Sequence, residues 1–295
     1  MEGAIRTLVQ KKVLNLCCGA FSDKWYGVAQ SCGKDAEKIQ VEWGEAIDPE
    51  AVRAKLAEGG FDTVTMAHNE TSTGVMNDLA GIAAVVNEFP DVLLVVDTVS
   101  SLSAVPVEMD KLGIDVVLAG VQKALALPPG LAVFAISEAA LERASTTEGR
   151  GYYFDFCEFE KNTVKNNTPS TPAISLLYAL KQKVDSIAEE GLEARFARHA
   201  KLNAMIHTWM AKHGFENFAP VGFQSKSLTA IDNTGGRLDV PAFIKALRAK
   251  HNVLINGGYG KIKGATFRIS NMGNETEETM QTLIDQLDDV IPSFL

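Results

Sequence analysis

The sequence has 295 residues, of which 46% are hydrophobic and 22% are charged, and its formal net charge is −9. This balance is typical of a globular protein with a large core in one or two domains. Since no run of lysine or arginine provides a basic surface, we expect no nucleic-acid partner and no anionic membrane as partner. No window approaches the roughly 18 uninterrupted apolar residues of a membrane span.

The four cysteines show no CxxC or Cys/His ligand spacing, so we expect no metal site. Nothing in their placement indicates a disulfide framework. The first residues, MEGAIRTLVQKK, lack the apolar stretch of a signal peptide. We therefore expect a cytoplasmic protein with reduced thiols.

The first half of the chain alternates short apolar runs with amphipathic segments. The predicted strands are residues 12–18, 38–44, 62–68, 91–97, 115–120 and 131–137, and the predicted helices are residues 22–33, 48–60 and 76–90. Ser22 is the expected N-cap of the first helix, and Asp48 with Pro49 opens the second. Continuously apolar strands between helices indicate a mostly parallel sheet that is covered on both faces.

The pattern changes near residue 172. Residues 173–214 are helical with a break near Glu190 and Gly191, and shorter strands and helices follow to the end of the chain. We expect a large domain over residues 1–172 and, over residues 173–295, a long connecting helix with a small α+β domain. Residues 150–172 are either a linker or a segment that reaches a neighbouring subunit.

Ligands of such sheets bind beyond the carboxyl ends of the strands. Asp97 ends one buried run, and Lys123 follows another. Alone, the aspartate could cap a turn and the lysine could be solvated. Together at one sheet edge, both charges lose solvation unless each has a partner.

Pyridoxal 5′-phosphate is a cofactor that uses such a pair. Its aldehyde forms a Schiff base with an amine, and a carboxylate keeps its ring nitrogen protonated, so that the ring withdraws electrons. Partial burial helps the lysine to lose its proton. The pair therefore predicts a pyridoxal-phosphate site.

Residues 97–134 resemble the class V (fold type I) pyridoxal-phosphate-dependent aminotransferases. They contain the family's D-x-x-S-S segment, its D-V-x-x-x-G-x-Q-K segment and the P-P-G-L that follows. Further segments resemble the family in the same order across nearly the whole chain: NLCCGAFSDKW, HNETSTGV and GGYGKIKGATFRISNMG. The resemblance implies an α/β fold type I transferase, with a mostly parallel sheet between helices and a smaller C-terminal α+β domain.

The resemblance also implies roles for individual residues. Lys123 would be the catalytic amine that binds the cofactor and moves the substrate proton. Asp97 would pair with the ring nitrogen, and Phe21 would stack on the ring. Arg268 would bind the substrate carboxylate, because its planar fork matches a carboxylate with two parallel bonds.

Six other residues belong to the implied cofactor site, some of them as alternatives. Thr73, or else Ser72, would contact the side of the ring that carries the hydroxyl. Gln122 would help to hold the phosphate, and Ser100 belongs to the segment after Asp97. Thr168 or Thr171 would reach the phosphate bound in the partner subunit of a homodimer.

Each of these residues also has an ordinary interpretation. Phe21 could belong to the core, the turn ETSTG could cap a helix, and Arg268 could lie on the surface. His68 is expected to be structural, since Lys123 already supplies the base. Three tryptophans are interpreted as packing residues: Trp25, Trp43 and Trp209. A tight or mobile loop beside the site is expected at Gly257, Gly258 and Gly260.

The resemblance is greatest to the alanine–glyoxylate, serine–glyoxylate and serine–pyruvate aminotransferases. We therefore expect transamination between a small amino acid, alanine or serine, and a 2-oxo acid, glyoxylate or pyruvate. Phosphoserine or aminoethylphosphonate aminotransferases are the alternative, with Lys261 and Lys263 as candidates to bind a distal anion. A lyase or desulfurase with the same cofactor is a further alternative; a desulfurase would need a mobile cysteine, for which Cys157 is the candidate.

Relatives have a phosphate-binding loop, rich in glycine and serine or threonine, immediately before the Met-Glu with which this sequence starts. That loop lies at a helix N-terminus. The sequence is therefore expected to lack this loop and the arm that precedes it. An inactive, truncated family member is the last alternative.

Overall fold

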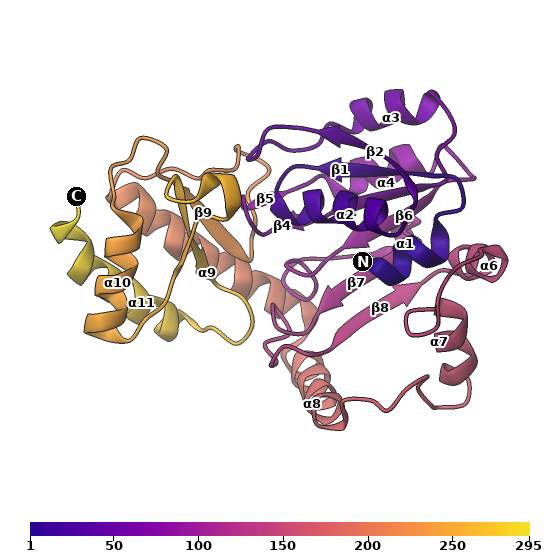
Figure 1. The fold of residues 1–295 in the computed structure, drawn as a ribbon. Helices are drawn as coiled ribbons and strands as arrows, with labels where there is room; N and C mark the ends of the chain where they lie inside the picture. The colour runs from indigo at the N-terminus through magenta and orange to yellow at the C-terminus, as the bar shows by residue number, and fades with distance from the viewer.

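The computed structural model describes residues 1–295, which form two lobes (Figure 1). The large lobe holds a six-stranded sheet in the order β2-β1-β3-β6-β7-β8. Its strands are β1 (Lys12–Cys17), β2 (Asp35–Gln40), β3 (Thr63–Ala67), β6 (Leu93–Asp97), β7 (Val116–Gly120) and β8 (Ala132–Ile136). All neighbours pair in parallel except β8, which runs antiparallel to β7. The predicted, mostly parallel sheet is therefore confirmed.

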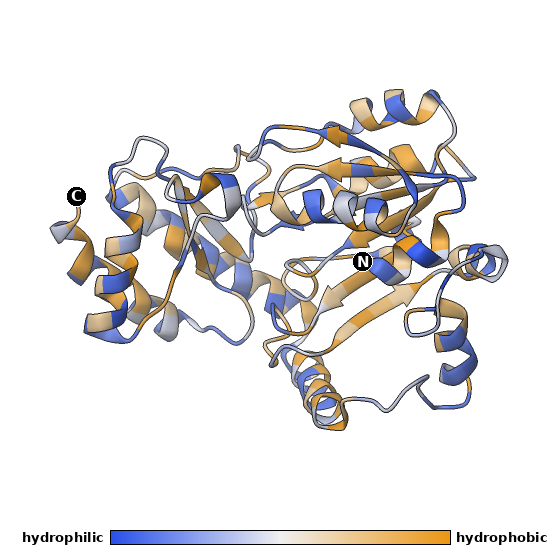
Figure 2. Ribbon diagram, in the orientation of Figure 1, coloured by the Kyte–Doolittle hydropathy of each residue, from blue (hydrophilic) through white to orange (hydrophobic).

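Helices cover both faces of this sheet. They are α1 (Glu2–Leu8), α2 (Ala20–Ser31), α3 (Pro49–Ala57), α4 (Leu79–Val86), α5 (Met109–Leu112), α6 (Glu138–Thr146) and α7 (Phe156–Thr163). Along β6, Leu94 and Val96 pack with α3 and α4, whereas Leu93 and Val95 pack with α1, α2 and α6. Successive strand residues point to opposite faces, so a strand that is covered twice must be apolar throughout. Figure 2 shows these strands mostly in the hydrophobic colour.

The start of α2 differs from the prediction. The helix begins at Ala20, after Gly19, and Ser22 lies inside its first turn. The Ser22 hydroxyl accepts the N–H groups of Cys18 and Gly19 at 2.9 and 3.0 Å. Ser22 therefore orders the turn that leads into the helix, although it is not the N-cap.

A short hairpin follows β3 and leads from the large sheet toward α4. It consists of β4 (Asn69–Glu70) and β5 (Val75–Met76). Gly74 closes its turn with φ +72°, a left-handed conformation that glycine adopts without strain.

The small lobe begins with two long helices that are broken at Gly191, as predicted. Its elements are α8 (Ile174–Glu190), α9 (Leu192–Lys212), β9 (Leu228–Asp232), α10 (Val240–His251), β10 (Asn256–Gly257), β11 (Thr266–Ser270), α11 (Glu277–Val290) and two 3₁₀ turns, Gly260–Ile262 and Ile291–Ser293. The strands form an antiparallel sheet in the order β10-β11-β9. This lobe has a buried core of its own, drawn entirely from residues 202–291. None of the helices combines the length and the apolar composition needed to cross a bilayer.

Candidate active site

The carboxyl ends of β1, β3, β6 and β7 lie next to one another at one edge of the large sheet. A cavity of about 510 Å³ lies between this edge and the small lobe. Segments from both lobes line it, including Phe21, Thr71, Gln122, Lys123, Tyr259 and Arg268. A cavity therefore lies at the strand ends where the sequence predicts a site; Lys123 lines it, whereas Asp97 is not among its lining residues.

Lys123 lies in the connection between β7 and β8. Its amine makes no hydrogen bond and no ion pair within the chain. Burial lowers the pKa of Lys123, and the nearby Arg268 lowers it further, while Asp97 and Glu70 act in the opposite direction. An amine that loses its proton more easily is a better nucleophile and base.

Asp97 is the last residue of β6 and is 6% exposed. One carboxylate oxygen accepts the N–H of Val99 at 2.9 Å, and the other accepts Nε1 of Trp25 at 3.0 Å. No cationic side chain lies within ion-pair distance, and burial raises the pKa of Asp97. The N-terminal ammonium lowers this pKa from beyond ion-pair distance. A buried carboxylate without an ion pair would be stabilised by a cationic partner.

Phe21 lines the cavity from the first turn of α2. Its backbone N–H and that of Ser22 donate to the carboxylate of Glu70, at 3.1 and 2.8 Å. A carboxylate at a helix N-terminus stabilises the unpaired N–H groups there. The sequence did not single out Glu70, yet this fully buried residue holds Phe21 in place.

The turn ETSTG places its residues differently from the prediction. Thr71 lines the cavity, and its hydroxyl lies 2.5 Å from that of the buried Ser100. The Ser72 hydroxyl instead donates to Glu70 at 2.7 Å. The hydroxyl of Thr73 is buried without a partner. Of the three, only Thr71 lines the cavity.

Arg268 reaches the cavity from β11. Its Nη1 donates to the carbonyl of Thr71 at 3.0 Å, and its Nε donates to that of Gly257 at 3.2 Å. No carboxylate pairs with it, and burial lowers its pKa. The guanidinium is thus held in place while Nη2 makes no hydrogen bond within the chain.

The sequence predicts a tight or a mobile loop at the glycines between β10 and β11. The structure shows a tight loop. A side chain on Gly258 would come within 1.9 Å of the Ile262 carbonyl oxygen. The loop presents Tyr259, whose ring centroid lies 5.4 Å from that of Phe21. Tyr259 was not among the predicted site residues.

The remaining predicted residues fall in three places. Gln122 lines the cavity and folds over Gly120, where a Cβ would come within 2.5 Å of its Oε1. Thr168 and Thr171 lie exposed between α7 and α8, and neither lines the cavity. Lys261 and Lys263 lie outside the lining as well.

Two other side chains of chemical interest are in non-reactive states. Burial lowers the pKa of His68 to about 4, so its ring is neutral at pH 7. Burial raises the pKa of the Cys18 thiol to about 12. Cys157 lies in α7, and no cysteine lines the cavity.

The family model described as "Aminotransferase class-V" matches residues 18–283. An uncharacterized aminotransferase of Methanocaldococcus jannaschii is 36% identical over 92% of this chain and 72% of its own length. The serine–glyoxylate aminotransferase of Arabidopsis thaliana is 31% identical over 90% of this chain and 68% of its own.

A solved structure shares nearly the whole fold. The crystal structure of an alanine–glyoxylate aminotransferase from Nostoc sp. superposes with a TM-score of 0.93 and 30% identity. The match covers 99% of this chain and 78% of that one.

Proposed function

Because the chain belongs to the class-V aminotransferase family, we propose that its cavity transfers the amino group of alanine or serine to glyoxylate or pyruvate. The protein is a pyridoxal-phosphate-dependent aminotransferase of fold type I, acting on an amino acid and a 2-oxo acid. Beyond this family membership, we propose that the substrates are small and that the individual residues have the roles described below.

The residues around the cavity fit pyridoxal phosphate. Lys123 is an amine without a partner, and Asp97 is a buried carboxylate without a counter-ion. Phe21 lines the same cavity as Lys123 and supplies an aromatic ring there. The cofactor has an aldehyde for the amine, a basic ring nitrogen for the carboxylate and a flat ring for the phenyl group.

When bound, the cofactor supplies an electron-poor ring that stabilises negative charge at the substrate α-carbon. Lys123 holds the cofactor and then, as a neutral amine, takes and returns the α-proton. Asp97 keeps the ring nitrogen protonated, and Trp25 holds Asp97 in orientation. Arg268 binds the α-carboxylate, which points the α-hydrogen at Lys123.

The cavity's charges favour a substrate with a small, neutral side chain. Lys123 and Arg268 are the only cations of this chain that line it. A distal phosphate or carboxylate would need a further cation, since a buried anion without one is costly. This speaks against phosphoserine or aminoethylphosphonate as the donor. The absence of a lining cysteine likewise speaks against a desulfurase.

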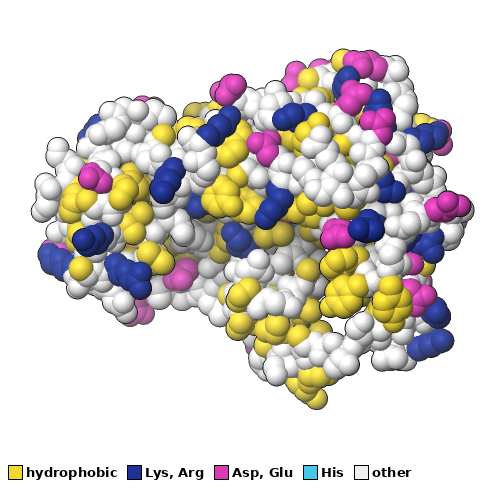
Figure 3. Space-filling model, viewed as in Figure 1, with side chains coloured by type: hydrophobic (Ala, Val, Ile, Leu, Met, Phe, Trp, Pro, Cys, Tyr) yellow, Lys and Arg dark blue, Asp and Glu magenta, His cyan; other side chains and the backbone are white.

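A homodimer is part of the proposal. Several large apolar side chains are exposed along the lower part of the large lobe and on α8 (Figure 3): Tyr152, Tyr153, Ile174, Tyr178 and Val184. Exposed apolar patches of this kind mark interaction surfaces. Thr168 and Thr171 belong to the same stretch of chain, which supports their expected reach into a partner subunit. Size-exclusion chromatography with light scattering tests the dimer.

The observation that carries the proposal is that Lys123 and Arg268, one from each lobe, line the same cavity. The test compares the purified protein with Lys123→Ala, each with pyridoxal phosphate, by visible absorption and by product formation. We expect a lysine-dependent band that bleaches with alanine or serine as the 2-oxo acid appears. Phosphoserine and aspartate serve as comparison donors. A wild-type protein that binds the cofactor but converts neither alanine nor serine, or that prefers phosphoserine or aspartate, would contradict the proposal.

A further inference from the structure

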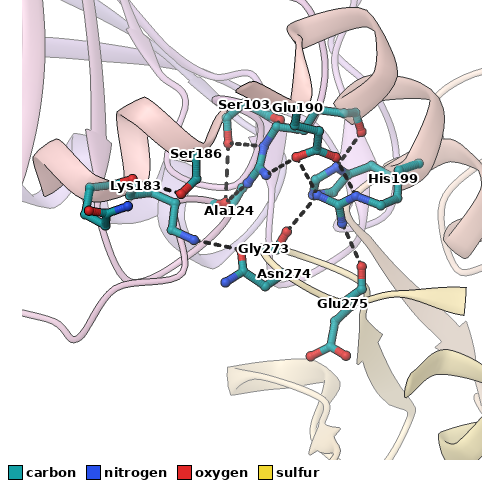
Figure 4. A network of polar contacts seen from close by, with 12 residues as sticks. Ser103, Ala124, Lys183, Ser186, Glu190, His199, Gly273, Asn274 and Glu275 are labelled. Atoms are coloured by element: carbon teal, nitrogen blue, oxygen red, sulfur yellow. Dashed lines mark hydrogen bonds and ion pairs between the residues drawn. The ribbon is translucent and has the colours of Figure 1, made fainter. Parts of the chain in front are cut away.

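A network of polar contacts, with Arg195 buried and Glu190 and Arg198 partly exposed, lies around the break between α8 and α9 (Figure 4). Its centre is the carboxylate of Glu190, which pairs with Arg195 and Arg198. Arg195 is 2% exposed, although arginine is almost never fully buried unless it is paired. None of the three residues lines the cavity.

Arg195 holds the backbone next to the catalytic lysine. Its Nη2 donates to the carbonyl of Ala124 at 2.7 Å, and its Nε donates to that of Ser103 at 3.1 Å. Ser103 also donates its hydroxyl to the Ala124 carbonyl, at 3.3 Å. One guanidinium thus fixes the peptide between Ala124 and Leu125, one residue beyond Lys123.

The backbone in this region is strained. Ser103 has φ +66° and Ala126 has φ +54°, which are left-handed conformations unusual for residues with a side chain. Such conformations persist where surrounding contacts hold them, and they are concentrated at functional sites. Arg195 supplies that contact at Ser103.

Arg198 holds the turn that follows the substrate-binding strand. Its Nη1 donates to the carbonyl of Glu275 at 2.7 Å, and its Nη2 donates to that of Gly273 at 3.2 Å. This turn begins two residues after β11, which carries Arg268. It also touches the lysine loop, because a Cβ on Gly273 would lie 2.7 Å from the Cβ of Ala126.

Glu190 links the two arginines, Arg195 and Arg198. Its oxygens accept from Arg198 at 2.6 and 3.0 Å and from Arg195 at 2.9 Å. The Arg198 guanidinium, and then that of Arg195, keep the pKa of Glu190 at about 2, so it is ionised at neutral pH. The carboxylate therefore bridges two arginines that bind different segments of the site.

We propose that Arg195 and Arg198, joined by Glu190, are positioning residues that hold the loop of Lys123 and the strand of Arg268 at a fixed spacing. The inference rests on the proposed function of these two residues. A base and a carboxylate anchor must act on one substrate at once, and a displacement of about 1 Å can reduce the rate roughly 100-fold.

The test replaces each arginine by lysine, which keeps the charge but loses the planar fork. Arg143→Lys is the matched control. Arg143 is also largely buried and donates to two backbone carbonyls, those of Asp62 and Asp91, but it lies away from the cavity. For Arg195→Lys we expect kcat to fall roughly tenfold or more with a smaller change in KM. For Arg198→Lys we expect mainly a higher KM for the amino acid.

A second measurement uses the protein without cofactor. An amine-reactive label is applied over a range of pH, and modification of Lys123 is followed by mass spectrometry, with the exposed Lys24 as internal reference. In the wild type, burial and Arg268 lower the pKa of Lys123 against the opposing effect of Asp97 and Glu70. Arg195→Lys should move the apparent pKa toward the ordinary value, because a loosened loop exposes the amine. Arg143→Lys should leave it unchanged.

Glu190→Gln provides an independent variant should either lysine variant fail to fold, since it keeps the size and removes the charge. The proposal is overturned if the folded variants lose only as much thermal stability as Arg143→Lys and keep the wild-type kcat, KM and Lys123 titration. The labelling result does not depend on the substrate. A wild-type protein without transaminase activity would therefore refute the proposed function, while labelling would still decide whether the arginines position Lys123.

Discussion

Nε1 of Trp25 lies 3.0 Å from Oδ2 of Asp97, so a residue of α2 supports the carboxylate at the end of β6. Both side chains are buried, at 1% and 6% exposure. The indole therefore both packs in the core and orients the group that would face the cofactor's ring nitrogen.

Trp25→Phe removes this bond and keeps most of the packing. A hydrogen bond to a charged group contributes about 1.5–3 kcal/mol, so we expect cofactor affinity to fall roughly tenfold or more. Fluorescence titration with pyridoxal phosphate measures the change. Trp209→Phe is the control, because Trp209 makes the same kind of bond to Asp288, in the small lobe. Equal affinities in the two variants would refute the role of Trp25.

Replacing each threonine of the ETSTG turn by valine should have different effects on cofactor binding. Thr71→Val breaks the contact with Ser100 on the cavity wall and should weaken cofactor binding. Thr73→Val removes a buried hydroxyl that has no partner, so it should leave binding unchanged and stability equal or slightly higher. Titration with cofactor and thermal unfolding of both variants measure this. The reverse order of affinities would favour Thr73 as the cofactor contact.

Gly273→Ala should disturb the lysine loop, because the new methyl group would meet Ala126 at 2.7 Å. Gly264→Ala is a matched control. Its φ of +83° is close to the +85° of Gly273, but nothing lies within 4 Å of the added Cβ. Both variants carry the left-handed penalty of about 1–2 kcal/mol. Only Gly273→Ala should also lower kcat, which steady-state kinetics can compare.

Acid should weaken the contacts of Glu190. The folded-state pKa of Glu190, about 2, lies below its ordinary 4.5. Its contribution to the free energy of unfolding is therefore complete above about pH 4.5 and is lost as the pH falls toward 2. Urea unfolding at several pH values should show a steeper loss in the wild type than in Glu190→Gln. Parallel pH profiles would contradict this.

Much of the large lobe could be predicted because its signals are local. The strands β6 and β7 are continuous apolar runs, with Asp97 at the end of one and Lys123 shortly after the other. The break at Gly191 was likewise visible as a glycine within a helical pattern. Apolar periodicity and turn residues report on a segment's own conformation, and these features depend on little else.

The supporting residues could not be predicted, because their roles depend on distant segments. Trp25 and Asp97 are 72 positions apart, and nothing around Trp25 distinguishes a packed indole from a bonded one. Arg195 lies in a charged helical stretch that is typical of a solvated face, yet it is buried against Ser103 and Ala124. The sequence prediction named Thr73 or Ser72, whereas Thr71 lines the cavity, because the backbone path of a five-residue turn is not determined by residue types alone.

The separate core of the small lobe has a consequence for how such an enzyme changes over evolution. Arg268 and Tyr259 come from the lobe whose core is drawn from residues 202–291, while Asp97, Phe21 and Lys123 come from the other. Substitutions that reshape substrate recognition can therefore accumulate in one lobe without repacking the residues around the cofactor. Selection for a new amino donor can act on the small lobe alone, as long as Arg198 keeps its hydrogen bond to the carbonyl of Gly273.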